Sequence, residues 1–121
     1  MLERPELDYI AGVLKRELAG VPIRRVDVRR SIVLRCFVEG TPDQVLGGHA
    51  LGSVRRRGHF LMFELIGPHE IELVAAPLEN GFFSLVGPGA AQPRDLSISF
   101  VLADGRELRY RDALQRGKIY V

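Results

Sequence analysis

Cysteine is almost absent from this chain, since Cys36 is the only one among its 121 residues. A lone cysteine excludes an internal disulfide, and its apolar neighbours Leu34, Phe37 and Val38 predict a buried thiol in a reducing compartment. No apolar run approaches the roughly 20 residues that span a bilayer. Residues 1–6 carry acids and no apolar segment, so no secretory signal is recognisable. We therefore expect a cytoplasmic protein that does not enter a membrane.

Metal-binding and nucleophile motifs are missing as well. His49, His59 and His69 are spaced ten residues apart and Cys36 has no C-x-x-C partner, so the sequence offers no metal-ligand spacing. No Ser-His-Asp arrangement is recognisable, and the glycines of residues 87–89 indicate a turn rather than a phosphate-cradling loop. We predict no metal and no other cofactor in this chain.

The composition that remains is that of one globular domain. Hydrophobic residues make up 46% of the chain and charged residues 26%, which argues against disorder. A length of 121 residues is enough for one hydrophobic core and too short for two. We therefore expect residues 1–121 to form a single domain.

Positive charge is concentrated in one part of the chain, although the net charge is only +2. Paired and tripled arginines favour phosphate contact, because the planar guanidinium binds two oxygens at once. A solvated charged face is the alternative interpretation. The segment Ile23–Gly58 has no lysine and carries +5, from eight arginines (Arg24, Arg25, Arg29, Arg30, Arg35, Arg55, Arg56, Arg57) and three acids (Asp27, Glu39, Asp43).

The apolar spacing predicts one long helix followed by mostly β structure. Pro5 suits the first position of a helix over residues 5–19, and Gly20 suits its C-cap. Val26 and Val28 then share one face of a strand. Thr41-Pro42 predicts the start of a short helix that Gly47-Gly48 ends. The apolar positions of the long helix are Leu7, Ile10, Ala11, Leu14 and Leu18.

The second half of the chain predicts a series of short strands. The clearest hairpin is Leu96–Tyr110, in which Asp104-Gly105 predicts a type I′ turn with both residues at positive φ. One long helix, one short helix and about eight short strands predict an α+β fold, a β-sandwich flanked by the helices. The expected strands are Ala50–Arg57, Phe60–Ile66, Glu70–Ala75, Phe82–Val86, Leu96–Leu102, Arg106–Arg111 and Lys118–Val121.

Several stretches resemble one protein family, in the same order along the chain. Met1–Asp8 resembles the family opening Met-Pro-Glu-Leu-Pro-Glu-Val-Glu, and Gly20–Val26 resembles Gly-x-x-Ile-x-x-Val. Val54–Leu61 is similar to V-x-R-R-G-K-Y-L, and Leu102–Asp112 is similar to D-D-G-x-x-L-x-F-x-D. Gly117 stands where the family's arginine-phenylalanine-glycine loop ends. The family is that of the formamidopyrimidine/endonuclease VIII-type DNA glycosylases, and the resemblance implies the fold of their N-terminal domain.

The resemblance also implies a mechanism, and Leu2 departs from it. In the family, methionine is removed and the exposed proline amine attacks C1′ of a damaged nucleotide that is flipped from the duplex, while a carboxylate moves protons. Leu2 occupies the position of that proline, so Met1 should stay in place; its own amine acting as nucleophile is the competing idea. Glu3 and Glu6 match family carboxylates and are the candidate catalytic residues. The alternative for both is an acid near a helix start.

The positions that would contact DNA phosphates are also altered. His59 stands where the family has a lysine that contacts phosphate, and a histidine, being largely neutral at pH 7, would bind phosphate more weakly. Arg55 and Arg57 alternate with Arg56 along a strand, so only one of these two sets faces a nucleic acid.

The loops that would enter the base stack depart too. Glu79 falls near the family's void-filling methionine, where a carboxylate is unfavourable. The arginine-phenylalanine wedge is replaced by residues 114–116, in which Arg116 or Leu114 would substitute only in part. We name His59, Arg55, Arg57 and Arg116 as candidate DNA-binding residues.

These departures predict a domain that keeps the family's scaffold, with damaged double-stranded DNA as its partner. Its base excision on its own is expected to be impaired or absent; any activity would be that of a DNA glycosylase and AP lyase. A non-catalytic nucleic-acid-binding module with an arginine-rich face is one alternative, and a fold relic that serves protein–protein interaction is another. The family's helical and zinc-finger domains would follow Val121 and are expected to be absent from this chain.

Overall fold

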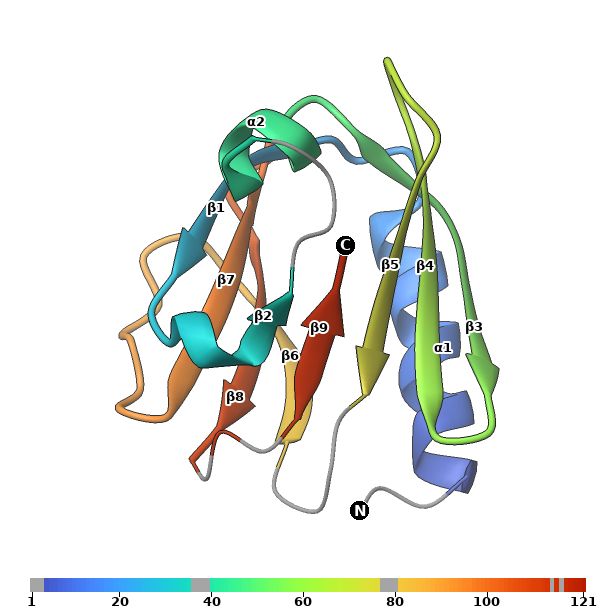
Figure 1. Cartoon of the computed structure of the whole chain (residues 1–121), viewed down its shortest axis with the longest axis vertical. Helices are drawn as coiled ribbons and strands as arrows, with labels where there is room; N and C mark the ends of the chain where they lie inside the picture. The colour runs from blue at the N-terminus through green and yellow to red at the C-terminus, as the bar shows by residue number, and fades with distance from the viewer. Residues whose placement is uncertain (1–3, 36–39, 77–80, 114, 116) are drawn as a thin grey trace.

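The chain forms the expected α+β fold, in which two β-sheets face each other and a long helix lies beside them (Figure 1). The computed structural model describes residues 4–35, 40–76, 81–113, 115 and 117–121. The elements are α1 (Arg4–Leu18), β1 (Ile23–Val28), the 3-10 turn η1 (Ser31–Val33), β2 (Leu34–Arg35), α2 (Pro42–Leu46), β3 (Ala50–Arg57), β4 (Phe60–Ile66), β5 (Ile71–Ala76), β6 (Gly81–Val86), β7 (Leu96–Leu102), β8 (Glu107–Asp112) and β9 (Lys118–Tyr120).

The strands divide into a four-stranded and a five-stranded sheet. The first has the order β1-β7-β8-β6 and the second the order β2-β9-β5-β4-β3. All neighbours pair antiparallel except β2 and β9, which are parallel. β1 and β3 are therefore edge strands of different sheets, although both belong to the arginine-rich segment.

Helix α1 forms because its apolar residues recur on one face. Ala11, Leu14 and Leu18 are buried and Ile10 packs beside them, as the helical spacing predicts. The helix begins at Arg4 and ends at Leu18, one residue earlier at each end than predicted. Gly20 has a φ of 78°, a conformation that costs glycine little and that reverses the chain after the helix. Helix α1 packs against the edge strand β3.

The short helix α2 begins where its capping residues predict. The Thr41 side chain accepts a hydrogen bond from the Gln44 backbone N–H, and the Gln44 side chain accepts one from the Thr41 backbone N–H. This reciprocal capping box satisfies two backbone donors at the helix start. Val45 and Leu46 are buried and fasten the helix over the edge of the sandwich where β1 begins.

The expected strands are confirmed to within a residue at each end, and one further strand appears. The described residues contain nine strands, and β2 is the addition to the sequence prediction. Strand β2 has only two residues, and its parallel pairing with β9 joins segments that are more than eighty residues apart. No local sequence pattern predicts a pairing that is so short and joins such distant segments.

The predicted type I′ turn of the β7–β8 hairpin is wrong. The loop has three residues, Ala103, Asp104 and Gly105, and of these only Gly105 has a positive φ, 91°. The Gly105 N–H donates to the Leu102 carbonyl at 3.0 Å, and the Leu102 N–H donates to the Arg106 carbonyl at 2.9 Å. This is a type I turn followed by a left-handed glycine, the commonest three-residue hairpin loop. Asp104 instead accepts from the Arg106 N–H at 3.0 Å.

Both faces of the central strands β7 and β8 are covered. Their inner residues meet the five-stranded sheet, whereas Ser97, Ser99 and Arg109 point the other way and are buried too. Arg109 donates to the carbonyls of Ala91 and Ala90 at 2.8 Å and 2.9 Å, and these residues precede β7. The 87–95 segment therefore covers the outer face of the four-stranded sheet.

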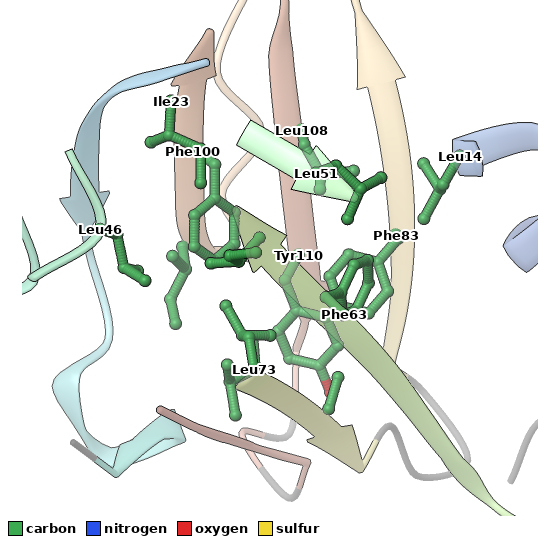
Figure 2. Close-up of a cluster of buried hydrophobic side chains, with 14 of the residues drawn as sticks. Leu14, Ile23, Leu46, Leu51, Phe63, Leu73, Phe83, Phe100, Leu108 and Tyr110 are labelled. Carbon is green, nitrogen blue, oxygen red and sulfur yellow. The ribbon is translucent and has the colours of Figure 1, made fainter. Parts of the chain in front are cut away.

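The core lies between the two sheets and extends to α1 (Figure 2). Phe63 and Phe83 lie 5.5 Å apart between ring centroids, and Phe83 and Tyr110 lie 5.1 Å apart, with tilted rings. Such tilted aromatic pairs add about 0.5–1.5 kcal/mol each beyond the area they bury. Leu14 closes the core on the helix side.

None of the described helices is long and apolar enough to cross a membrane.

Candidate nucleic-acid interface

One end of the sandwich gathers segments that lie far apart in the sequence (Figure 1). Helix α1 begins there, the β3–β4 turn lies beside it, and the neighbouring strands β5 and β6 meet this end as well. The strand pairings place the ends of further strands here. Ala76 at the end of β5 pairs with Lys118 at the start of β9, and Gly81 at the start of β6 pairs with Asp112 at the end of β8. The described residues that flank most of the sequence-predicted site positions therefore converge at this end.

Several predicted site positions lie outside the described residues. Met1, Leu2 and Glu3 precede them, and the side chain of Glu6 is not among the described ones. Glu79 and the predicted DNA-binding residue Arg116 are also outside, as are Leu114 and Cys36. The catalytic and wedge roles of these residues, and the burial of Cys36, stay predictions.

The β3–β4 turn carries the candidate phosphate contacts. Arg55 and Arg57 are exposed and lie two residues apart on β3, and His59 is exposed in the turn itself. Gly58, with a φ of 63°, makes the turn tight. Arg56 points the other way, where its Nε donates to Asp8 of α1 at 2.6 Å. The structure thus brings Arg55, Arg57 and His59 to one place, while their contact with DNA stays a prediction.

The eight arginines of the basic segment do not form one face. Those of β1 and the following turn lie on the four-stranded sheet, whereas those of β2 and β3 lie on the five-stranded sheet. Several are engaged: Arg29 lies 3.7 Å from Asp27, Arg56 binds Asp8, and Arg35 donates to backbone carbonyls. The arginines that cluster in sequence are therefore divided into separate groups in the structure.

A buried hydrogen-bond network lies beneath the loops at this end. Asp112 is 2% exposed, and its Oδ2 accepts from the Tyr110 hydroxyl at 3.0 Å and from the Gly117 N–H at 2.7 Å. Tyr110 is fully buried. Burial, followed by the neighbouring Asp112 carboxylate, raises the pKa of the Tyr110 hydroxyl above its ordinary value. The hydroxyl therefore stays protonated and acts as the donor to Asp112.

Two glycines allow the loops to approach this network. A Cβ on Gly117 would lie 1.8 Å from the Tyr110 hydroxyl, and a Cβ on Gly81 would lie 2.2 Å from it. Any larger residue at either position would collide with the hydroxyl. The Tyr110 hydroxyl thus requires glycine at the start of β6 and directly before β9. Sequence reasoning marked Asp112 and Gly117 as family matches but did not find this network, because it depends on the depth of Tyr110.

The histidines are brought together only in part. His49 is buried and its Nε2 lies 3.1 Å from the His69 carbonyl oxygen, with the two rings 6.5 Å apart. His59 lies at the β3–β4 turn, away from both. In the part of the chain that the structure describes, no three metal-ligating side chains gather.

These features define a class of protein, a helix-flanked β-sandwich domain whose basic turn and first helix meet at one end. Residues 1–119 match the sequence model of the formamidopyrimidine-DNA glycosylase N-terminal domain, and the chain belongs to this family.

Several similar proteins are formamidopyrimidine-DNA glycosylases that are longer than this chain. The formamidopyrimidine-DNA glycosylase of Symbiobacterium thermophilum is 34% identical over 121 residues, which is all of this chain and 39% of that protein. The one from Halalkalibacterium halodurans is 29% identical and is covered to 43%. The chain thus spans about two fifths of the length of these relatives.

Solved structures confirm the fold. Lactococcus lactis Fpg (MutM), solved in a complex with FAPY-dG-containing DNA, has a TM-score of 0.87 at 20% identity. The match covers 98% of this chain and 43% of that one. The same protein in a complex with abasic-site DNA gives a TM-score of 0.86 at 21% identity. At this identity the likeness establishes the arrangement of helices and strands and nothing finer.

Proposed function

We propose that this chain is a DNA-repair domain that binds damaged double-stranded DNA through the end of the sandwich formed by the β3–β4 turn and the start of α1. Its base excision on its own is impaired or absent. The observation that carries the DNA contact is the joint exposure of Arg55, Arg57 and His59 at this end in a member of the glycosylase family.

The charge and spacing of these side chains suit a phosphate backbone. Two residues along a strand rise about 7 Å, so Arg55 and Arg57 present two guanidinium groups side by side. Neither has an ionic partner among the described residues, in contrast to Arg56, which binds Asp8. Guanidinium groups that are exposed and unpaired release counterions when they meet phosphates, which favours binding at low salt.

The catalytic part of the proposal rests on sequence. Leu2 stands where the family resemblance places the proline nucleophile, and Glu79 stands near its void-filling methionine. A chain that keeps Met1 carries a primary amine one residue away from the position of the family's proline amine, so its nucleophile is out of register with the site. A carboxylate in the base stack opposes nucleotide flipping. Both changes lower base excision and leave in place the basic end of the sandwich, which binds the DNA phosphate backbone in this proposal.

Binding is tested with the purified 121-residue chain and duplexes that carry 8-oxoguanine, FAPY-dG or an abasic site. Fluorescence anisotropy over a salt series should give an affinity whose logarithm falls linearly with the logarithm of the salt concentration. The double variant Arg55→Gln/Arg57→Gln should bind more weakly and lower that slope by about 2. Arg24→Gln is the matched control and should change little, since Arg24 is exposed at the start of β1. Strand β1 contacts α2, which lies at the other end of the sandwich. Absence of binding at low salt contradicts the proposal and leaves protein–protein contact as the role.

Excision is tested separately on the same duplexes. We expect no covalent adduct on borohydride trapping with abasic-site DNA at any pH, and no base release. The formamidopyrimidine-DNA glycosylase of Bacillus subtilis, 27% identical to this chain, serves as the comparison protein in both assays. Release of 8-oxoguanine or an oxidised pyrimidine by the 121-residue chain alone would overturn this part of the proposal while leaving the binding part intact.

A further inference from the structure

A basic hollow lies on the four-stranded sheet, away from the β3–β4 turn. Its volume is about 260 Å3, and it is lined by Arg29, Arg30, Gln92, Pro93, Arg94 and Leu96. Arg29 and Arg30 follow β1, residues 92–94 precede β7, and Leu96 is the first residue of β7. The hollow therefore forms where two segments that are about sixty residues apart come together. Neither the family resemblance nor the basic end described above accounts for it.

Backbone hydrogen bonds hold the two segments in place. The N–H groups of Arg29 and Arg30 both donate to the Ser97 carbonyl, at 2.8 Å and 3.0 Å. The Leu96 N–H donates to the Pro93 carbonyl at 3.3 Å. Ser97 itself is fully buried. The arginines therefore start from fixed backbone positions, which reduces the ordering cost of binding an ion between them.

Neutral groups orient the guanidinium groups. Arg29 Nη2 donates to Gln92 Oε1, and Arg30 Nη2 lies 3.4 Å from the Arg94 carbonyl oxygen. These uncharged acceptors position the two side chains and leave their charge in place. A guanidinium keeps further donors after one such bond, because it has five N–H groups.

Little negative charge is available to neutralise the hollow. Asp27 lies 3.7 Å from Arg29, with both side chains more than 40% exposed, and an exposed pair of this kind is weak. Asp95, beside Arg94, is bound to Arg111 at 2.7 Å instead. Among the described residues the hollow therefore has three cationic side chains and one weakly held acid.

We propose that this hollow binds a phosphate group, through Arg30 and Arg94 with support from Arg29. A hollow lined by three arginines suits an anion with several oxygens, because each guanidinium fork can bind two oxygens at once. The group comes either from a nucleic-acid backbone, as a phosphodiester, or from free phosphate. The inference does not depend on DNA binding at the β3–β4 end, since inorganic phosphate alone tests it.

The test is a titration of the isotope-labelled chain with inorganic phosphate, followed by amide NMR at constant ionic strength. Saturable shifts are expected at Arg29, Arg30, Arg94 and Leu96, with chloride giving none. The double variant Arg30→Gln/Arg94→Gln should weaken the apparent affinity at least tenfold. The Arg30→Lys/Arg94→Lys variant keeps the charge and loses the planar guanidinium forks. Its apparent affinity for phosphate should lie between those of the native chain and the glutamine variant. Arg24→Gln is again the control.

Duplex binding then separates the two sources of phosphate. A lower salt slope for Arg30→Gln/Arg94→Gln than for the native chain indicates a backbone phosphodiester. An unchanged slope, together with inorganic phosphate bound by the native chain and lost in the variant, indicates the free ion. Shifts that do not saturate, or that persist in the glutamine variant with a native spectrum elsewhere, overturn the inference. The Arg55→Gln/Arg57→Gln variant should keep its phosphate shifts, so failure of this site and failure of the DNA interface are distinguishable.

Discussion

At the scale of single residues, Tyr110 is where this chain adds a contact to its family pattern. The family-like L-x-F-x-D stretch has phenylalanine at this position, and the extra hydroxyl donates to the buried carboxylate of Asp112. Asp112 also accepts from the Gly117 N–H, and so links β8 to the start of β9. The second oxygen of Asp112 has no partner among the described residues. Each of the two hydrogen bonds on Oδ2 therefore matters to a carboxylate that is shielded from water.

Replacing Tyr110 with phenylalanine should lower the free energy of unfolding by about 1–3 kcal/mol, because a buried carboxylate loses one of its two donors. The measurement is urea denaturation at pH 7. Tyr9→Phe is the matched control, since Tyr9 is 73% exposed, and it should change stability by less than about 0.5 kcal/mol. Equal stability of both variants would mean that the Tyr110 hydroxyl contributes nothing.

The same residue predicts a decline in stability at high pH. Burial and the Asp112 carboxylate raise the pKa of folded Tyr110 above its ordinary value of about 10. The unfolded chain therefore loses this proton first, so the contribution is complete below about pH 10 and is lost as the pH rises further. The stability difference between the native chain and Tyr110→Phe should shrink from pH 9 to pH 11 in denaturation curves. A constant difference over that range contradicts the pKa direction.

At the scale of elements, the spacing of apolar residues predicted the strands whose signals are local. It did not predict the pairing of segments that lie far apart in the sequence. Strand β7 has the predicted bounds, because its β-rich run is closed by turn residues on both sides. Strand β2 was missed because its two residues pair with β9 across most of the chain. The basic segment is continuous in sequence, yet its strands β1 and β3 join different sheets. Charge clustering in sequence does not specify which sheet a strand enters.

The candidate site follows the same division. The alternation of Arg55, Arg56 and Arg57 was predictable, because side chains of a strand alternate between its faces. That Arg56 meets Asp8 was not, since it depends on how α1 packs against β3. The hollow around Arg30 and Arg94 likewise needs the fold to bring two distant segments together.

Glu107, on the outer face of the β7–β8 hairpin, predicts that the stability of the chain falls at acid pH. The Glu107 carboxylate accepts from the Ser99 hydroxyl at 2.6 Å and from Arg109 at 3.3 Å, and Arg25 adds a favourable charge. The Ser99 hydrogen bond first, and then the two arginines, hold the pKa of Glu107 below its ordinary value of 4.5. A lowered folded pKa gives stability that is complete above about pH 4.5 and is lost as the pH falls through the folded pKa.

The variant Glu107→Gln should therefore be less stable than the native chain at pH 6–7, and the difference should shrink as the pH falls below about 4.5. Urea denaturation between pH 3 and pH 7 measures it. Glu72→Gln is the control, because the Glu72 side chain is exposed on β5 and makes no hydrogen bond or ion pair among the described residues; its difference should stay small throughout. A Glu107 difference that does not vary with pH would show that the carboxylate charge is not stabilising.

At the scale of the whole molecule, one core connects the helix with both sheets. Leu14 of α1, Phe63 of the five-stranded sheet and Phe83 of the four-stranded sheet belong to the same buried cluster (Figure 2). Neither sheet can bury its inner face without the other, and α1 has its apolar stripe on that shared core. The elements that carry the basic end and the basic hollow therefore share one hydrophobic core.

We expect the chain to unfold in a single transition, and Leu14→Ala to weaken all of it at once. The chain has three tyrosines and no tryptophan, so tyrosine fluorescence reports on all three, the buried Tyr110 included, while far-UV circular dichroism reports on the strands. The two signals should give the same midpoint in urea. Leu14 is fully buried, so Leu14→Ala should cost about 2–5 kcal/mol and shift both midpoints equally. Lys15→Ala is the control on the exposed side of α1, and two separate midpoints in the Leu14→Ala chain would mean that α1 and the sheets are stable independently.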